Sequence, residues 1–254
     1  MVQNIRNIAL VLEYDGTNFS GWQIQPNLRT VQNALGESLE KMLHHKVKII
    51  AAGRTDAGVH ASGQVMNFRT ESDFDIRLLK KALNAVLPRD ISIIKAAEMP
   101  EDFNARFDAR SRTYRYVISN RKLSIGRQYA WYVKYSLTPE SLILATEGLL
   151  GECSLKGFSK KNDDDDYSTI IFKNFWKCED NLMIFEIEAI RFFQHAVRNI
   201  VGSAVECARG KKPSGLINLI LKTGDNRIAG PLAPPSGLCL TKVDYGDNYN
   251  EQLR

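Results

Sequence analysis

The residues best suited to do chemistry lie in one nonapeptide, residues 53–61 (GRTDAGVHA), which follows an apolar, strand-like run. Gly53 and Gly58 allow backbone angles that other residues resist, so a tight loop can form around Asp56. Arg54 lies two residues before Asp56, which on an extended backbone puts both side chains on one face. A carboxylate beside a guanidinium stays ionised, and this is the state that a nucleophile or a general base needs. The same string also fits a plain turn that carries a surface Arg–Asp pair.

A second candidate region is basic and aromatic. Residues 104–121 contain five arginines against a single acid, Asp108, and the arginines alternate with Tyr114 and Tyr116. Guanidinium groups match phosphate oxygens and aromatic rings stack on bases, so the segment is suited to RNA. A solvated strand edge has the same composition, and the segment alone leaves both interpretations open. The five arginines are Arg106, Arg110, Arg112, Arg115 and Arg121.

Length and composition set the class of protein. The 254 residues can bury one large core, or two of about 100–125 residues each. A hydrophobic content of 44% and a charged content of 25% are ordinary for a soluble globular protein. No 18-residue apolar stretch is present, so no membrane span is expected, and the first residues lack the apolar run of a secretory signal. We therefore expect a cytoplasmic protein without membrane contact.

Metal and cofactor motifs are missing from the sequence. Four cysteines and four histidines are scattered, with no C-x-x-C pair and no histidine at a metal-binding spacing from a cysteine. The sequence therefore predicts no metal and no cofactor. The formal net charge of +5 permits an anionic partner without identifying one.

The elements that must position these residues come in mixed order. Strands are expected at residues 8–14, 47–52, 64–68, 91–97, 112–119, 183–190 and 238–245. Helices are expected from Thr30 to Met42, from Asp75 to Pro88 with Val86 facing inward, from Thr138 to Gly151, and at 192–208 and 214–222. This order favours an α+β fold with two related lobes of mixed, mainly antiparallel sheet, flanked by helices, and an active-site cleft between the lobes.

Three parts of the chain follow from this pattern. We place an N-terminal lobe that carries Asp56 at residues 1–107. A C-terminal lobe at residues 108–246 carries Tyr114 and Arg198. Residues 247–254 are expected to be a short tail.

With these residues in view, the chain resembles the TruA family of tRNA pseudouridine synthases over nearly its whole length. The matching motifs are YDG at 14–16 with Phe19, GWQ at 21–23 with Gln25, TVQ at 30–32 with Leu35, GRTDAGVHA at 53–61, DFNARF at 102–107, TYRY at 113–116, VRNIVG at 197–202, and the stretch 237–245. The resemblance implies that Asp56 is the nucleophilic aspartate, that Tyr114 contacts the target base, and that Arg198 pairs with the aspartate.

Two stretches depart from the family pattern. Within residues 155–177 the family usually has a polar run that ends in an arginine, whereas this chain has the acidic run 163–166. Such a run repels a polyanion, so it is expected in an exposed loop away from any RNA. Ala196 also stands where methionine is more usual, which we interpret as a packing change.

The resemblance implies an isomerase that converts uridine to pseudouridine at positions 38, 39 and 40 of the tRNA anticodon stem-loop, and that works as a homodimer. The reaction breaks the C1′–N1 bond, rotates the uracil and rejoins it through C5, which requires neither redox cofactor nor metal. Arg198 would offset the cost of burying the Asp56 carboxylate. Arg54 would fill the space left by a flipped-out base or hold its phosphate, and His60 is expected to be a structural hydrogen-bonding group.

The main alternative is a non-catalytic RNA-binding module, with Tyr114 and Tyr116 as stacking residues and Asp56 as a structural cap. The combination of Asp56, Tyr114 and Arg198 argues against it, because a pure binder gains little from a buried carboxylate facing RNA. A serine hydrolase lacks its G-x-S-x-G motif, and a retaining glycosidase would need a second carboxylate opposite Asp56.

Overall fold

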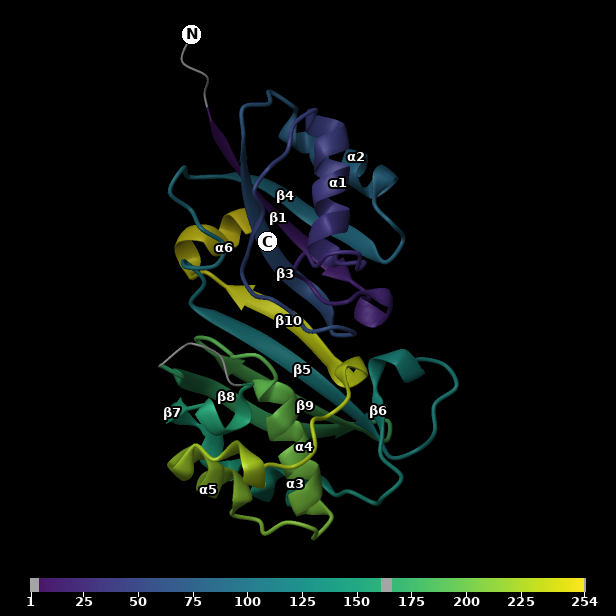
Figure 1. Cartoon of the computed structure of the whole chain (residues 1–254), viewed down its shortest axis with the longest axis vertical. Coiled ribbons are helices and arrows are strands. Elements are labelled where there is room, and N and C mark those ends of the chain that lie inside the picture. Colours follow the sequence, from purple (N-terminus) through teal and green to yellow (C-terminus); the bar gives the residue numbers. More distant parts are fainter. Residues whose placement is uncertain (1–4, 161–165, 254) are drawn as a thin grey trace. The chain divides into compact units, whose positions relative to one another are not determined.

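The computed structural model describes residues 5–160 and 166–253, and Figure 1 labels its elements. The chain forms two compact units, one made of Met1–Arg110 with Leu240–Arg254 and one made of Ser111–Cys239. Each unit combines sheet and helices in mixed order, which confirms the α+β class. The first unit therefore draws on both ends of the chain, and it includes residues that the sequence pattern assigns to the second lobe and to the tail.

The sheet of the first unit is built around β1 (Arg6–Tyr14). This strand pairs antiparallel with β3 (His60–Thr70) on one side and with β4 (Ile91–Met99) on the other. The short strand β2 (Ile50–Ala51) pairs antiparallel with β3, and β10 (Leu238–Asp244) follows β3 in the strand order. Fully buried side chains of β1 and β3 form the centre of this core, among them Leu10, Leu12, Met66 and Phe68.

Two helices of the first unit begin where the sequence predicts. Helix α1 (Val31–Leu43) follows Thr30, whose hydroxyl accepts a hydrogen bond from the Asn33 backbone N–H at 3.4 Å. Helix α2 (Ile76–Val86) follows Asp75, whose carboxylate accepts from the Arg77 backbone N–H at 2.9 Å and so satisfies a donor of the first turn.

The end of α2 differs from the expected pattern. Val86 is 50% exposed, and the next residue, Leu87, is buried instead. The helix ends at Val86, and Leu87 is extended, with ψ 150°. The change of backbone direction turns the side chain after the helix, and not the one before it, toward the core.

The last helix of the first unit lies where a tail was expected. Helix α6 (Asp247–Leu253) packs against β4 and β1. The Tyr249 ring lies edge-on to Phe103, with the ring centroids 5.1 Å apart. The sequence pattern did not predict this helix, because its residues are mostly polar and none is fully buried, so they show no apolar helical period.

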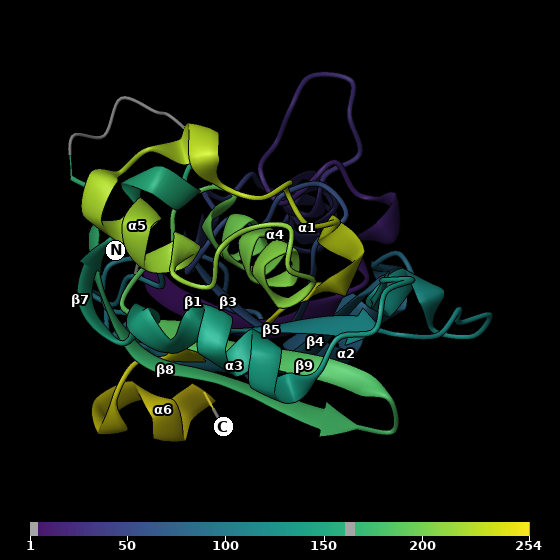
Figure 2. The ribbon, with the colours of Figure 1, turned by 90° about the horizontal axis from the view of Figure 1, so that it is seen from below.

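The sheet of the second unit is led by a long hairpin. Strands β8 (Ser168–Glu179) and β9 (Leu182–Ala189) are joined by Asp180 and Asn181, both with positive φ, as two-residue hairpin turns require. Figure 2 shows this hairpin running alongside α3. Strand β5 (Ser111–Ser119) pairs antiparallel with β9, β7 (Gly151–Ser154) pairs antiparallel with β8, and β6 (Trp131–Tyr132) runs parallel to β5.

Strand β8 was not among the expected elements. Its burial does not alternate cleanly, because Ile171 is buried, Phe172 is 54% exposed, and a register irregularity separates Ile171 from Lys173. A strand with such a bulge carries no clear period of two. Of the acidic run, residues 163–165 lie outside the described residues.

Asp166 of that run forms an ion pair with Arg191 and accepts a hydrogen bond from the Ser168 backbone N–H at 2.8 Å. Hydrogen bonds from Ser168, together with the Arg191 guanidinium, lower the pKa of Asp166 to about 2.

The helices of the second unit are α3 (Pro139–Thr146), α4 (Ala196–Ala208) and α5 (Leu216–Thr223). Thr138 caps α3 through a hydrogen bond from the Ser141 N–H, and Gly224 ends α5 with φ 65°. The sequence pattern placed the start of α4 at Phe192. It begins later because His195 adopts a left-handed conformation with φ 72°, which interrupts the helical path.

The described residues also contain short 3-10 helices. These are η1 (Gly16–Asn18), η2 (Arg127–Tyr129), η3 (Glu147–Leu149), η4 (Lys156–Phe158), η5 (Asn226–Ile228) and η6 (Pro235–Gly237).

Candidate active site

The loop of residues 53–61 belongs to the first unit and runs from β2 into β3. Asp56 is half-buried at the middle of this loop, Thr55 beside it is buried, and Arg54 is exposed. The loop ends inside β3, because His60 and Ala61 are already part of that strand. A rigid strand therefore begins four residues after the Asp56 carboxylate.

Backbone hydrogen bonds fix the loop on both sides of Asp56. The Trp22 N–H donates to the Thr55 carbonyl at 3.0 Å, and the Gly58 N–H donates to the Phe19 carbonyl at 3.1 Å. Within the loop, the Val59 N–H donates to the carbonyl of Asp56 itself at 3.1 Å. The loop is therefore hydrogen-bonded to the segment after β1, through Phe19 and Trp22, and these bonds set the backbone position of Asp56.

Two glycines make this close approach possible. Gly21 has φ +96°, and a Cβ at that position would lie 2.8 Å from the Thr55 carbonyl oxygen. A Cβ on Gly16 would lie 2.0 Å from the Val59 carbonyl oxygen. Neither position can accept a side chain. The loop of residues 53–61 is therefore packed directly against the backbone of the YDG and GWQ motifs.

Buried side chains add a second set of contacts. The Tyr14 hydroxyl and the Thr55 hydroxyl form a hydrogen bond of 2.7 Å, and the Gln64 side chain, which is fully buried, donates to the Gly53 carbonyl at 2.9 Å. Sequence reasoning did not single out Thr55 or Gln64. The sequence signals that could have identified them are that Thr55 is a polar residue next to a candidate nucleophile, and that Gln64 is a polar residue directly before apolar Val65 and Met66 of an expected strand.

His60 is a structural group, as the sequence predicts. Its Nδ1 accepts a hydrogen bond from the Gly16 N–H at 3.0 Å, so in this geometry Nδ1 carries no proton. The Asp15 carboxylate lies 3.1 Å from the same nitrogen, but it already accepts from the Thr17 backbone N–H and hydroxyl. The Asp15 and His60 side chains therefore bring the turn after β1 into contact with the start of β3.

Tyr114 lies on β5 in the second unit and is 8% exposed. Its ring meets the Phe192 ring edge-on, at 5.3 Å between centroids and 89° between planes. This is a favourable geometry for an aromatic pair, and it fixes the tilt of the Tyr114 ring.

Arg198 lies in the first turn of α4 and is 9% exposed. Its Nε donates to the Ala233 carbonyl at 2.7 Å, and its own carbonyl accepts from the Ala233 N–H at 3.3 Å. A Cβ on Gly202, one turn later, would lie 1.8 Å from the Pro231 carbonyl oxygen. The chain around Ala233 therefore lies tightly along α4 and orients the guanidinium of Arg198.

The neighbouring Tyr116 is not available to stack on RNA, which decides between the two interpretations that the sequence left open for it. It is fully buried, its hydroxyl donates to the Pro234 carbonyl at 2.7 Å, and its ring meets Trp131 edge-on. Burial raises the pKa of Tyr116 well above its ordinary value, and the charge of Arg198 opposes that rise only in part.

The arginines of residues 104–121 also divide by environment. Arg112 is 9% exposed and donates to the Ile190 carbonyl at 2.8 Å, so it is part of the interior of the second unit and not of a phosphate-binding surface. The other four are exposed: Arg106, Arg110, Arg115 and Arg121.

The candidate residues are thus divided between the units, with Arg54 and Asp56 in the first and Tyr114 and Arg198 in the second. The backbone around Asp56 and the side chains of Tyr114 and Arg198 are held by contacts that the local sequence does not reveal. In chemical terms the first unit offers a positioned carboxylate, and the second offers an oriented guanidinium and an oriented phenol.

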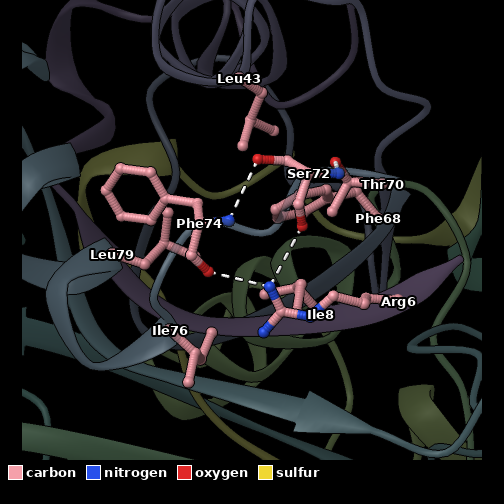
Figure 3. Close-up of a pocket in the computed structure, with 9 residues that line it drawn as sticks. All are labelled: Arg6, Ile8, Leu43, Phe68, Thr70, Ser72, Phe74, Ile76 and Leu79. Carbon is pink, nitrogen blue, oxygen red and sulfur yellow. Dashed lines mark hydrogen bonds between the residues drawn. The ribbon is translucent and has the colours of Figure 1, made fainter. Parts of the chain in front are cut away.

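A pocket in the first unit, drawn in Figure 3, is a packing feature. Its lining is mainly apolar, and Arg6 is the charged residue in it. Arg6 donates to the carbonyls of Ser72 and Phe74 at 3.1 and 2.9 Å, and to Glu98 at 2.7 Å. These bonds tie the turn before α2 to β1 and β4, and the pocket contains none of the candidate residues.

Among residues 5–160 and 166–253, no three or more His, Cys, Asp or Glu side chains are grouped so that they could hold a metal ion. In the same residues no helix has the length and apolar character needed to span a membrane.

Comparison with known proteins places these residues in a family context. A family model described as tRNA pseudouridine synthase matches residues 10–108 and 145–246. Asp56 and Arg198 lie inside the matched ranges, and Tyr114 lies between them.

Three relatives are named tRNA pseudouridine synthase A. That of Geotalea daltonii is 40% identical over 247 residues, which cover 95% of this chain and 100% of the relative. That of Caldicellulosiruptor bescii is 39% identical over 245 residues, with the same coverage. That of an Exiguobacterium species is 40% identical over 243 residues, with coverage of 95% and 98%. A solved structure, a Cbf5-Nop10-Gar1 complex, covers 92% of this chain and 58% of its own with 10% identity and a TM-score of 0.39, which is too low to support an argument.

Proposed function

Because the chain belongs to the tRNA pseudouridine synthase family, we propose that it isomerises uridine at positions 38, 39 and 40 of the tRNA anticodon stem-loop, with Asp56 as the nucleophile. The observation that carries this proposal is the loop around Asp56. Thr55 and Gly58, on either side, are held by backbone hydrogen bonds, while Asp56 itself is half-buried. A nucleophile needs this combination of fixed position and access to substrate.

The reaction exchanges one bond of the nucleotide for another. The Asp56 carboxylate attacks C6 of the base or C1′ of the sugar, the C1′–N1 bond breaks, and the uracil turns. C5 then bonds to C1′, the bond between the Asp56 carboxylate and the nucleotide breaks, the proton on C5 leaves, and N1 gains a proton. Substrate and product have the same composition, so the step balances without an oxidant or a reductant.

We assign supporting roles to three further residues. The Tyr114 ring contacts the target base, and its hydroxyl is suited to take the C5 proton. The Arg198 guanidinium provides the charge that keeps the Asp56 carboxylate ionised in a closed site. The target uridine must leave its stack at a cost of a few kcal/mol, and Arg54, which is exposed, fills the vacated space or binds the flipped phosphate.

Substitution of Asp56 tests the proposal. Asp56→Asn removes the nucleophile and keeps the size of the side chain, so we expect no pseudouridine in tRNA that is incubated with the variant and then mapped. Affinity for tRNA should be nearly unchanged, because phosphate contacts dominate binding. Asp73→Asn is the matched control, since it removes an exposed carboxylate of the same unit, and it should act like wild type.

The same experiment separates an enzyme from an RNA-binding module. A module that only binds would bind tRNA and leave every uridine unchanged, in wild type and variant alike. Substantial turnover by Asp56→Asn would instead show that another group is the nucleophile.

We further propose that the chain acts in the cytoplasm as a homodimer that binds tRNA. The support is the family resemblance. Light scattering of the purified protein at micromolar concentration tests the dimer, and a mass near 28.7 kDa, that of a single chain, would contradict it.

A further inference from the structure

The chain after β1 leaves the first unit in an exposed excursion, residues 23–28, before it enters α1. We call the four residues that precede the excursion, 19–22, the neck. The two sides of the excursion are joined at the neck, where the Ser20 N–H donates to the Arg29 carbonyl at 2.8 Å. The exposed residues are therefore anchored at their base.

The neck is the part of the chain that holds the loop around Asp56. The Phe19 carbonyl accepts from the Gly58 N–H, and the Trp22 N–H donates to the Thr55 carbonyl. Phe19 and Trp22 are 3% and 2% exposed, so the neck itself is buried. A displacement of the neck therefore moves the residues on both sides of Asp56.

The Arg29 side chain holds the neck from its solvent side. Its guanidinium donates two hydrogen bonds to the Asp90 carboxylate, at 2.8 and 2.7 Å. Its Cζ atom also lies 3.9 Å from the centroid of the Phe19 ring. A planar guanidinium can form a two-bond fork and lie over a ring at the same time, whereas an ammonium group cannot form the fork. One side chain therefore links the neck to Asp90.

Asp90 belongs to the framework of the first unit. It lies directly before Ile91, the first residue of β4, which pairs with Tyr14 at the end of β1. The Asp90 carbonyl accepts a hydrogen bond from the Asp15 N–H at 3.0 Å. Arg29 therefore ties the neck to the central strands of the sheet.

The exposure of this ion pair indicates a role other than stability. The Arg29 and Asp90 side chains are 44% and 22% exposed, and ion pairs as exposed as this contribute little to the free energy of unfolding. What gives Arg29 influence over the site is its contact with the Phe19 ring, because the carbonyl of Phe19 accepts the hydrogen bond from Gly58.

We propose that Arg29 is a positioning residue for pseudouridine formation. It holds the neck between the sheet and the excursion, and the neck sets the place of the Asp56 carboxylate. The proposal rests on the proposed function, because it takes Asp56 as the nucleophile. A reacting group displaced by about 1 Å can react on the order of a hundredfold more slowly. A contact outside the site can therefore change the rate of the chemical step.

Single-turnover kinetics with tRNA test this role. Arg29→Ala removes both contacts, so we expect a rate roughly ten- to a hundredfold below wild type, with nearly unchanged tRNA affinity. The amplitude should be full, since the amplitude measures the folded enzyme and the rate measures its positioning. Arg29→Lys keeps the charge without the fork, and its rate should lie between those of wild type and Arg29→Ala. A wild-type rate in Arg29→Ala, or a loss of amplitude alone, would overturn the proposal.

Asp90→Asn separates positioning from a direct contact between Arg29 and RNA. The substitution removes a negative charge and releases the guanidinium, so a direct phosphate contact would be strengthened and the rate kept. Positioning predicts a slower reaction, although the surface becomes more positive. The double variant should be no slower than Arg29→Ala, because both residues act through one contact. A wild-type or higher rate in Asp90→Asn would refute positioning.

Arg77→Ala is the matched control for the loss of an ion pair. Arg77 pairs with Asp75 at 2.7 Å in the same unit, the same distance as between Arg29 and Asp90. This variant should react at the wild-type rate. If it were slowed as much as Arg29→Ala, the effect would be a general one of lost ion pairs, and Arg29 would have no special role.

Hydrogen exchange tests the positioning step without the reaction. The amides of Gly58 and Trp22 are hydrogen-bonded between the neck and the loop, so they should exchange faster in Arg29→Ala than in wild type. Arg77→Ala should leave both rates unchanged. Full protection of both amides in Arg29→Ala would contradict the proposal. If wild type made no pseudouridine, the proposed function would fail, whereas exchange would still show whether Arg29 holds the neck.

Discussion

Tyr114 and Tyr116 have the same side chain and lie on the same face of β5, yet their surroundings assign them different parts. The Tyr116 hydroxyl is buried and donates to the Pro234 carbonyl, so it holds the chain next to α4. Tyr114 retains 8% exposure and has its ring fixed by Phe192. Only Tyr114 is suited to meet a substrate.

Substitutions by phenylalanine separate the two tyrosines. Tyr114→Phe keeps the ring and loses the hydroxyl, so we expect normal tRNA affinity and a single-turnover rate lower by about 10²–10⁴-fold, the usual worth of a positioned acid or base. Tyr116→Phe is the control. It leaves the Pro234 carbonyl without its donor and should lower the free energy of unfolding by about 1–3 kcal/mol. A wild-type rate in Tyr114→Phe would reduce that residue to an aromatic contact.

For single residues, the sequence predicts which side chains share a face of a strand, but not whether that face is covered by other parts of the chain. The period of two places Arg112, Tyr114 and Tyr116 together, as the structure confirms. It does not reveal that Arg112 and Tyr116 are covered, because the covering groups, at Ile190 and Pro234, lie about 80 and 120 residues later. Residue type and spacing therefore predicted a basic, aromatic strand and left open whether Tyr116 stacks on RNA, an interpretation that its burial excludes.

At the scale of elements, the loop around Asp56 takes its turn from its own sequence and its position from a second segment of the chain. Its own glycines predict a turn, but its position comes from a second segment, which supplies the backbone groups of Phe19 and Trp22. The sequence presents the two motifs separately, and only the folded chain shows that Gly21 is the point of contact. Helix caps behave differently, because Thr30 and Asp75 act within three residues and were predicted correctly.

Gly21→Ala should disturb the site from outside the loop. The added Cβ meets the Thr55 carbonyl at 2.8 Å, and φ +96° is strained for alanine. We expect both a lower melting temperature and a lower rate of pseudouridine formation. Gly36→Ala, in α1, is the control, since nothing lies within 4 Å of its Cβ. It should be neutral or more stable by about 0.5–1 kcal/mol. Equal behaviour of the two variants would contradict the role of Gly21.

The cap of α2 gives a pH-dependent prediction. Hydrogen bonds from the Arg77 side chain and backbone lower the pKa of Asp75 to about 2, against about 3.9 in an unfolded chain. The charged carboxylate therefore stabilises the folded state fully above pH 4, and this contribution is lost as the pH falls toward 2. Asp75→Asn keeps a capping oxygen without charge. Its deficit in unfolding free energy, measured with urea, should be present at pH 6 and shrink toward pH 2.5. A deficit that stayed constant would contradict the linkage.

For the whole molecule, the chain order has a consequence for the unit that carries Asp56. Residues 240–254 return to that unit after the second unit is complete. The Arg110 N–H donates to the Asp244 carbonyl at 2.7 Å, and a Cβ on Gly63 would lie 2.3 Å from the Thr241 carbonyl oxygen. The first unit is therefore completed by the last residues of the chain, although the loop around Asp56 lies far earlier. The order of the expected strands and helices predicted the α+β class but not this return, since nothing in the local sequence marks it.

Tyr245 is the residue at which this closure can be tested. It is 2% exposed, its hydroxyl donates to the Ala105 carbonyl at 2.7 Å, and its ring lies 5.2 Å from that of Phe103. Tyr245→Phe keeps the ring and removes the donor to Ala105, which should lower the free energy of unfolding of the first unit by about 1–3 kcal/mol.

Hydrogen exchange locates the effect of Tyr245→Phe. Amides of β1 and β3 should exchange faster, whereas those of β8 and β9 should keep their wild-type rates, because the two pairs belong to different units. Tyr132→Phe, which removes a hydroxyl from a side chain that is 49% exposed, is the control and should change neither pair. If Tyr245→Phe accelerated exchange equally in all four strands, the chain would open as one cooperative body, and the last fifteen residues would not complete one unit alone.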